Sequence, residues 1–308
     1  MALDYRHTLI SVEEAQAWIA TGRAVVIDCR FELADPDAGA AMYRAAHLPG
    51  AVFWDLERDL SGPKGIGTGR HPLPSIDAFA ELIARASITP QTQVILYDEW
   101  DGMNAARAWW MLHACGYAAT AVLDGGFRAW RSAKLPVTKE IPLPPHRYQI
   151  PNLPSWKLPI VETDEVTAAC EQREVLLLDA RAPERYRGEV EPFDPVPGHI
   201  PGAVNRFFRA NVDASTGRFR PAEVLRAEFE SLLAGRDPAL TIHYCGSGVT
   251  ACHNLLAWFH SGLPFARLYP GSWGAWCSDP RRPVACPARQ DCDPPGRGAF
   301  ERKPGAAR

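Results

Sequence analysis

An internal repeat limits the folds open to this 308-residue chain more than any other feature of its sequence. Four short elements of the first half recur in the second half in the same order, each about 150 residues later. The spacing between partners changes only slightly along the chain, so we interpret the sequence as a duplicated unit with small insertions and deletions. The paired elements are residues 25–28 with 176–179, 47–52 with 199–204, 94–97 with 240–244, and 125–130 with 271–276.

Each half alternates short apolar runs with segments of helical periodicity. Residues 78–86 and 223–233 carry apolar side chains at helical spacing and precede a β-rich run; residues 105–115 and 250–261 follow such runs as helices. Alternating strands and helices, with strands apolar on both faces, are typical of a mostly parallel sheet covered on both sides. The predicted fold class is therefore α/β, with two tandem domains, each a mostly parallel sheet flanked by helices.

Composition suggests where the domains begin and end. We expect an N-terminal domain over residues 8–141, a linker over 142–159, and a C-terminal domain over 160–286. The linker contains six prolines, which predicts an extended and fairly stiff connection. From residue 287 to residue 308 the chain is rich in Pro, Gly, Ala, Arg and Asp, which predicts a disordered tail.

Charge and cysteine spacing exclude several classes of function. The chain has 33 Lys and Arg against 36 Asp and Glu, a net charge of −3, which argues against binding to nucleic acid or to an anionic membrane. The longest stretch without these charged residues, 238–266, contains His, Asn, Gly and Pro and does not resemble a membrane span. The N-terminus lacks the pattern of a signal peptide, so we expect a cytoplasmic protein. None of the eight cysteines forms a CxxC pair, so no metal site is predicted. Separately, we expect the protein to be a monomer.

One loop of the second half carries the strongest chemical signal. A β-rich run ends at Cys245, a Gly-Ser-Gly loop follows, and a helix begins near Thr250. Gly246 and Gly248 allow successive backbone N–H groups to face inward, and the positive end of the helix dipole adds to their field. This environment favours the nucleophilic thiolate form of Cys245, and Ser247 and Thr250 can donate further hydrogen bonds to it. The alternative interpretation is a buried cysteine before a tight turn.

The same loop argues against phosphatase chemistry. A cysteine phosphatase needs an arginine that closes the loop around three phosphate oxygens, but no Lys or Arg occurs between Cys245 and Ala266. Backbone amides alone are better matched to a smaller and softer anion, such as the outer sulfur of a persulfide.

The segment Cys-Gly-Ser-Gly-Val-Thr-Ala at 245–251 resembles the active-site loop of the 3-mercaptopyruvate sulfurtransferases, a group within the two-domain rhodanese family. The two His-[Leu/Ile]-Pro-Gly-Ala elements and the Gly-Ser-Trp-x-x-Trp segment resemble that family too, over about residues 8–285 in all. The resemblance implies two rhodanese-like domains, a persulfide on Cys245, and no metal or organic cofactor. It also implies an inactive first domain, where Asp98 follows Tyr97 in place of the cysteine. The implied substrate-binding loop is Gly246, Ser247, Gly248, Val249 and Thr250.

Residues outside the loop receive implied roles as well. Arg185 would pair with a substrate carboxylate, since a guanidinium can bind one in bidentate fashion; a plain surface arginine is the alternative. Glu57 and His71 would approach from the first domain and assist Ser247 in proton transfer, the alternative being a solvated carboxylate and a turn-capping histidine. The chain departs from the family at Phe193, where a second substrate-binding arginine is common.

The predicted activity is transfer of a sulfane sulfur from 3-mercaptopyruvate to a thiol or cyanide acceptor through a Cys245 persulfide. The neutral Gly246 and Ser247 suit a monoanionic keto acid better than the thiosulfate dianion. Two alternatives stay open: a thiosulfate sulfurtransferase, and a non-catalytic persulfide carrier or interaction module. The partners expected are a small-molecule sulfur donor and a thiol acceptor such as thioredoxin. His47 and His199 recur in both halves, which favours structural roles for them.

Overall fold

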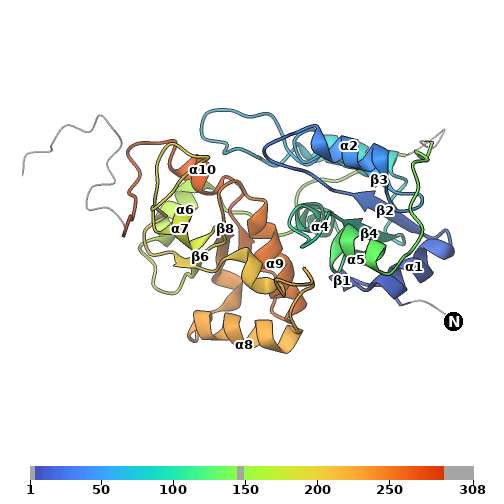
Figure 1. The fold of residues 1–308 in the computed structure, drawn as a ribbon. Helices are drawn as coiled ribbons and strands as arrows, with labels where there is room; N and C mark the ends of the chain where they lie inside the picture. The colour runs from blue at the N-terminus through green and yellow to red at the C-terminus, as the bar shows by residue number, and fades with distance from the viewer. Residues whose placement is uncertain (1–3, 144–148, 288–308) are drawn as a thin grey trace, which may run out of the picture.

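The computed structural model describes residues 4–143 and 149–287, and within them two α/β units follow one another along the chain (Figure 1). Nearly all of the tail predicted for 287–308 lies outside the described residues, as do residues 144–148 of the predicted linker. The first unit is built on one sheet and the second unit on another.

The sheet of the first unit has five parallel strands in the spatial order β1-β5-β4-β2-β3. In that order they are Leu9–Ile10, Thr120–Leu123, Gln93–Tyr97, Ala24–Asp28 and Val52–Phe53. Five helices connect or flank them: α1 Val12–Ala20, α2 Ala38–Ala45, α3 Ile76–Arg85, α4 Ala105–Ala114 and α5 Gly126–Ser132.

The second unit repeats this plan. Its parallel sheet has the order β7-β6-β8-β9, and Ile160 pairs beside Leu268 much as β1 pairs beside β5. The strands are Val204–Asn205, Leu177–Asp179, Ile242–Tyr244 and Arg267–Leu268. The helices are α6 Thr163–Ala169, α7 Pro183–Tyr186, α8 Ala222–Leu233, α9 Thr250–His260 and α10 Ser272–Trp276, with 3₁₀ turns at Phe208–Asn211 and Pro238–Leu240. The predicted α/β repeat is confirmed.

A shared core joins the two units through α4 and α9. Every residue of α4 is buried, and so are eight consecutive residues of the eleven in α9, from Ala251 to Trp258. A helix that is buried on all sides belongs inside a large core rather than on a surface. Trp109, Trp110 and Trp258 are each 0% exposed and belong to one apolar cluster that spans both units. The two sheets are therefore held together by packing as well as by the linker.

The histidines that recur in both units have the same structural contacts. Nδ1 of His47 lies 2.7 Å from the carbonyl oxygen of Tyr43, and Nδ1 of His199 lies 2.7 Å from that of Tyr186. Each imidazole also stacks on the ring of that tyrosine. Because the unit without a nucleophile has the same arrangement, these contacts are part of the fold.

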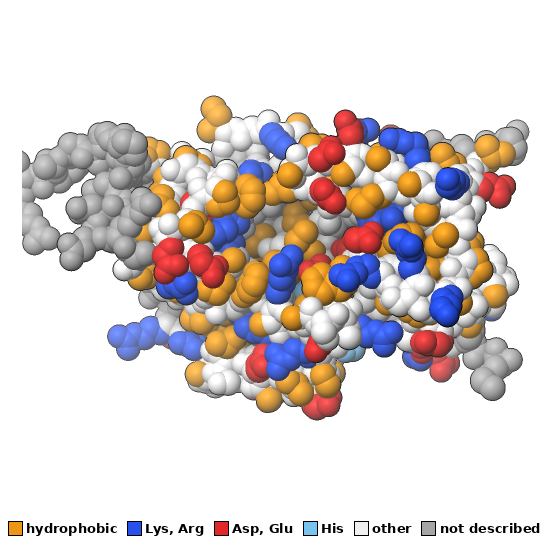
Figure 2. Space-filling view, viewed as in Figure 1, with side chains coloured by type: hydrophobic (Ala, Val, Ile, Leu, Met, Phe, Trp, Pro, Cys, Tyr) orange, Lys and Arg blue, Asp and Glu red, His pale blue; other side chains and the backbone are white. Residues whose placement is uncertain are grey.

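The surface is mixed in charge. On the face that Figure 2 shows, Lys and Arg side chains are interspersed with Asp and Glu side chains and with scattered hydrophobic ones. Among the helices of the described residues, none combines the length and apolar character that crossing a membrane requires.

Candidate active site

Cys245 lies directly after β8, where the chain turns toward α9. Its sulfur accepts hydrogen bonds from the backbone N–H of Gly248 at 3.1 Å and of Ser247 at 3.5 Å. Its own N–H donates to Oγ of Ser272 at 3.1 Å, which ties the end of the strand to the start of α10. The loop therefore curls around the sulfur with amide dipoles directed at it, the arrangement predicted from Gly246 and Gly248.

Gly248 is required by the backbone of this loop. Its φ is +81°, and a Cβ there would lie 2.5 Å from the carbonyl oxygen of Pro270. A larger residue would be strained by its φ and would also collide with backbone, so the loop would have to shift.

The loop forms the floor of a pocket of about 370 Å³ that lies between the two units. Cys245 is only 2% exposed, and its side chain is among those that line the pocket. Of the loop positions predicted to bind substrate, Gly246, Ser247, Val249 and Thr250 line it too. Much of the wall is apolar: Phe31, Leu33, Leu56, Met103, Phe193, Phe207 and Phe208.

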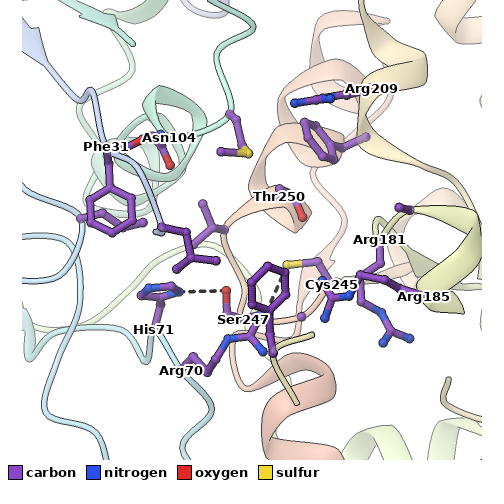
Figure 3. Close-up of a pocket in the computed structure, with 18 of the residues that line it drawn as sticks. Phe31, Arg70, His71, Asn104, Arg181, Arg185, Arg209, Cys245, Ser247 and Thr250 are labelled. Atoms are coloured by element: carbon purple, nitrogen blue, oxygen red, sulfur yellow. Dashed lines mark hydrogen bonds between the residues drawn. The ribbon is translucent and has the colours of Figure 1, made fainter. Parts of the chain in front are cut away.

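The structure brings Ser247, His71 and Glu57 together, although they come from different units. Nδ1 of His71 lies 2.9 Å from Oγ of Ser247, and Nε2 lies 3.1 Å from Oε1 of Glu57 (Figure 3 draws the first contact). A carboxylate accepts only, so we assign the ring proton to Nε2 of His71, which leaves Nδ1 to accept from the hydroxyl. Lys64 holds the other carboxylate oxygen of Glu57 at 2.7 Å.

Burial determines the charge of the three-residue relay formed by Ser247, His71 and Glu57. It lowers the pKa of His71 to about 4, although Glu57 acts in the opposite direction. For Glu57, burial acts to raise the pKa, but the contacts with Lys64 and His71 outweigh it and the pKa lies below its ordinary value. At neutral pH the relay is therefore a neutral imidazole on an ionised carboxylate, and it can accept a proton from Ser247.

Arg185 lines the pocket as predicted for a substrate-binding residue, but it already has carboxylate partners. Its Nη2 lies 2.6 Å from Oε1 of Glu191 and 3.2 Å from Oδ2 of Asp194. Its guanidinium carbon lies 4.9 Å from the centre of the Phe193 ring. The side chain is thus fixed at the pocket wall, and its role toward a substrate carboxylate stays a prediction.

Arg70 is a pocket residue that sequence reasoning missed. It comes from the first unit, forms an ion pair with Asp194, and lies over Phe193 with its guanidinium carbon 5.4 Å from the ring centre. The only signal available in the sequence was its position directly before His71.

Arg107 was also missed, and it lies behind the loop. It is 0% exposed on α4, and it donates to the carbonyl oxygens of Gly248 at 3.2 Å and His71 at 3.0 Å. Burial lowers the pKa of its guanidinium. One side chain of the first unit therefore supports both the nucleophile loop and the relay histidine.

Asp98 takes the position of the nucleophile in the first unit, directly after β4. Its carboxylate accepts hydrogen bonds from four backbone N–H groups of its own loop, at 2.8 to 3.2 Å. Burial, together with the charge of Asp101, raises the pKa of Asp98 to about 6 while these amides act in the opposite direction. The loop amides that could hold an external anion are occupied by this side chain.

Cys252, the nearest other cysteine in sequence, has no opening to the pocket. It is 0% exposed, and its Sγ lies 3.3 Å from the carbonyl oxygen of Gly248. Burial raises the pKa of Cys252 to about 12, so it stays a thiol at neutral pH. Within residues 4–143 and 149–287, no three His, Cys, Asp or Glu side chains are placed to hold a metal ion.

Comparison with known proteins adds to this geometry. Residues 11–133 and 162–279 each match the family described as "Rhodanese-like domain". A protein of Pseudomonas aeruginosa named "Probable 3-mercaptopyruvate sulfurtransferase" is 47% identical over 281 residues, which make up 90% of this chain and 97% of that protein. SseB of Mycobacterium tuberculosis, whose name proposes thiosulfate sulfurtransferase activity, is 40% identical over 280 residues, 90% of this chain and 96% of its own.

A solved structure agrees with the sequence relatives. The 3-mercaptopyruvate sulfurtransferase from Leishmania major matches with a TM-score of 0.76 at 28% identity, covering 89% of this chain and 75% of that one.

Proposed function

This chain belongs to the rhodanese-like family, and from that premise we propose that it is a sulfurtransferase that moves sulfur from 3-mercaptopyruvate to a thiol or cyanide through a persulfide on Cys245. One observation carries the proposal. The Cys245 sulfur accepts hydrogen bonds from the N–H groups of Ser247 and Gly248, and the hydroxyl of the same Ser247 contacts His71.

In the first half-reaction the Cys245 thiolate attacks the sulfur of the donor. A sulfur–sulfur bond forms, and the carbon–sulfur bond of the donor breaks with its electron pair going to the enolate of pyruvate. The thiol proton of the donor passes to that enolate, so the products are pyruvate and a persulfide anion on Cys245. The N–H groups of Ser247 and Gly248 stabilise the negative charge on sulfur before and after transfer.

The relay moves the proton that this reaction requires. The hydroxyl of Ser247 can exchange a proton with the donor while it gives its own to the neutral imidazole of His71. Glu57 stabilises the imidazolium that forms. In the second half-reaction a thiol, or cyanide, attacks the outer sulfur; a new persulfide, or thiocyanate, leaves and the Cys245 thiolate returns.

Thiosulfate is the second candidate donor, and two observations favour it. Several relatives carry a thiosulfate sulfurtransferase name, and Arg70 and Arg185 at the pocket could bind a dianion. Against it, thiosulfate releases sulfite without any proton transfer, so it would leave the Ser247–His71 contact without a function. The carboxylates Asp194 and Glu191 also offset the charge of these arginines.

The test is intact mass after incubation with each donor. Cys245 should gain one sulfur atom from 3-mercaptopyruvate faster than from thiosulfate, and Cys245→Ser should lose both the gain and turnover without a change in the melting temperature. The control is Cys170→Ser, at a partly exposed free cysteine outside the pocket, which should behave like the wild type. Turnover that survives in Cys245→Ser would refute the proposal.

The finer predictions belong to the same proposal. We propose domains at residues 8–141 and 160–286, with the first inactive because Asp98 replaces the cysteine. Reduced thioredoxin as the protein acceptor, a monomeric state and a cytoplasmic location stay predictions from the sequence.

A further inference from the structure

We propose that Arg209 binds a carboxylate on the thiol that takes sulfur from Cys245, so that the preferred small acceptor is a carboxylate-bearing thiol. The inference rests on the proposed function and deepens it, because it concerns the second half-reaction in the same pocket. In that step the acceptor sulfur attacks the outer sulfur of the persulfide. The bond between the outer sulfur and Cys245 breaks, and its electron pair returns to Cys245. The proton that the acceptor thiol gives up ends on the outgoing persulfide.

The first argument is the place of Arg209 in the pocket. It lies in the 3₁₀ turn Phe208–Asn211 of the second unit, and its side chain lines the pocket together with Cys245. In Figure 3, Arg209 and Arg185 lie on opposite sides of Cys245. Within the described residues these two arginines have no ionic partner in common. The pocket therefore has a second positive group, separate from the arginine predicted to bind the donor.

The second argument is that the guanidinium of Arg209 is open to a ligand. Its side chain is 57% exposed, against 15% for Arg185. Its one ionic partner in the described part of the chain is Asp101 of the first unit, whose Oδ2 lies 3.5 Å from Nε. Within that part of the chain Nη1 and Nη2 donate no hydrogen bond, so both can bind a carboxylate in bidentate fashion.

The third argument is what surrounds this guanidinium. Its carbon lies 5.7 Å from the centre of the Phe208 ring, and Phe207 packs against Phe208 and lines the pocket as well. These rings suit the short alkyl chain that joins a thiol to its carboxylate. The persulfide on Cys245 is an anion and repels a negatively charged acceptor, and the positive charge of Arg209 offsets that repulsion.

The experiment isolates the second half-reaction. Protein is loaded with sulfur from 3-mercaptopyruvate, freed of excess donor, and mixed with one of three short thiols. 3-Mercaptopropionate carries a carboxylate, 2-mercaptoethanol a hydroxyl and cysteamine an ammonium group. Loss of the Cys245 persulfide, followed by intact mass, gives a second-order rate constant for each acceptor. Each acceptor is compared with itself across variants, so differences in intrinsic thiol reactivity cancel.

Replacing Arg209 should change the preference among these acceptors. Arg209→Met should lower the rate constant for 3-mercaptopropionate about five- to tenfold, since one charge-assisted contact is lost, and should change that for 2-mercaptoethanol much less. Arg209→Glu should slow 3-mercaptopropionate further and speed cysteamine, because the sign of the charge is reversed. Arg209→Lys keeps the charge and should retain most of the preference for the carboxylate.

The matched control is Arg226→Met. Arg226 is a partly exposed arginine of the same unit that pairs with Glu230 on α8, outside the pocket, and its loss should leave all three rate constants unchanged.

Three results would overturn the inference. One is an unchanged rate constant for 3-mercaptopropionate in Arg209→Met. Another is an equal loss with all three thiols, which would make Arg209 a structural residue. The third is slower loading by 3-mercaptopyruvate with unchanged transfer to the acceptors, which would place Arg209 in the donor site. Wild-type protein that fails to load at all refutes the proposed function instead, and that failure is seen before any acceptor is added.

Discussion

The protonation of a few side chains decides what the pocket can do. His71 is neutral because burial lowers its pKa to about 4, and this leaves one ring nitrogen free to accept from Ser247. A charged imidazole in the same position could only donate. The site therefore needs the burial of His71 as much as it needs the hydroxyl of Ser247.

Removing the relay should affect the two donors differently. With 3-mercaptopyruvate, Ser247→Ala and His71→Gln should each lower kcat by about 10²- to 10⁴-fold, which is the rate enhancement that a positioned general acid or base usually contributes. With thiosulfate, which needs no proton, kcat should fall much less. Steady-state kinetics with cyanide as acceptor measures both. Ser278→Ala, a hydroxyl bonded to the carbonyl of Ala275, is the control. Equal losses with both donors would contradict a role in proton transfer.

Asp194 should control how much negative charge the pocket accepts. Asp194→Asn removes the charge that Arg70 and Arg185 share, so kcat/KM for the thiosulfate dianion should rise by roughly tenfold, corresponding to about 1.4 kcal/mol. The gain should shrink as ionic strength increases. Kinetics at low and high salt checks this, and a fall in thiosulfate activity would count against it.

Some of these side chains could be found in the sequence and others could not. The loop from Cys245 to Thr250 is contiguous, so its glycines and hydroxyls predict the amide cluster directly. Glu57 and His71 were identified only through the family resemblance. Arg70 and Arg107 carry no local pattern, because their place in the site depends on how the two units pack.

At the level of elements, the turn between β8 and α9 sets the geometry of the nucleophile. The helix begins at Thr250 because the chain first passes through Gly248 with φ of +81°. That conformation directs the Gly248 N–H to the Cys245 sulfur and its carbonyl to Arg107.

Gly235 and Gly248 have nearly equal positive φ, but an added Cβ would collide with backbone only at Gly248. Comparing alanine variants at the two positions therefore separates the effect of backbone strain from the effect of the collision. Gly235→Ala, at φ +85° with nothing within 4 Å of the new Cβ, should cost about 1–2 kcal/mol of stability and leave activity unchanged. Gly248→Ala adds the collision with Pro270, so it should cost more stability and also lose most of the activity as the amide leaves the sulfur. Urea unfolding and kcat/KM test the pair. Equal activity in the two variants would show that the loop tolerates displacement.

Helices were predicted better than strands. The predicted helix at 78–86 corresponds to α3, which begins two residues earlier because Ser75 caps it through the N–H of Ala78. The two-residue strands β3 and β7 were not predicted individually, since so short a run has no measurable periodicity. Their places follow from pairing with β2 and β6.

Across the whole molecule, buried histidines should make stability depend on pH. Burial lowers the pKa of His71 and His113 to about 4 and that of His243 to about 3. The unfolded chain binds these protons near pH 6.5, whereas the folded chain does not. The free energy of unfolding should therefore be highest above pH 6.5 and fall as pH decreases toward 4, by about 3 kcal/mol for a histidine shifted this far.

Asp98 has the opposite effect on the free energy of unfolding over the same pH range. Its raised pKa of about 6 lets the folded protein bind a proton that the unfolded chain releases, and burial raises the pKa of four more carboxyl groups, those of Asp59, Glu99, Asp124 and Asp194. Against these groups, burial also lowers the pKa of three further histidines, His199, His253 and His260. Urea unfolding at pH 7 and pH 5 measures the net effect. His113→Gln, which keeps a donor toward the carbonyl of His7, should reduce the difference. Stability that rises between pH 7 and pH 5 would contradict this account.

The duplication itself was the most reliable global prediction, because four paired elements agree on it and the parallel sheets follow from the alternation. How the two units face each other could not be predicted. The contact is made by α4 and α9, which are mostly apolar in sequence and so indicate burial without indicating a partner.

On the proposed mechanism, Asp98 also limits how many sulfur atoms one molecule can carry. Its carboxylate is a permanent occupant of the first amide cluster, so only the second cluster is open to a transferred atom. With an excess of donor and no added acceptor, pyruvate should be released in an initial burst of one equivalent per chain, followed by slower release as the donor's own thiol accepts the sulfur. The amplitude of that initial burst would then count the working molecules in a preparation, although each contains two copies of the fold.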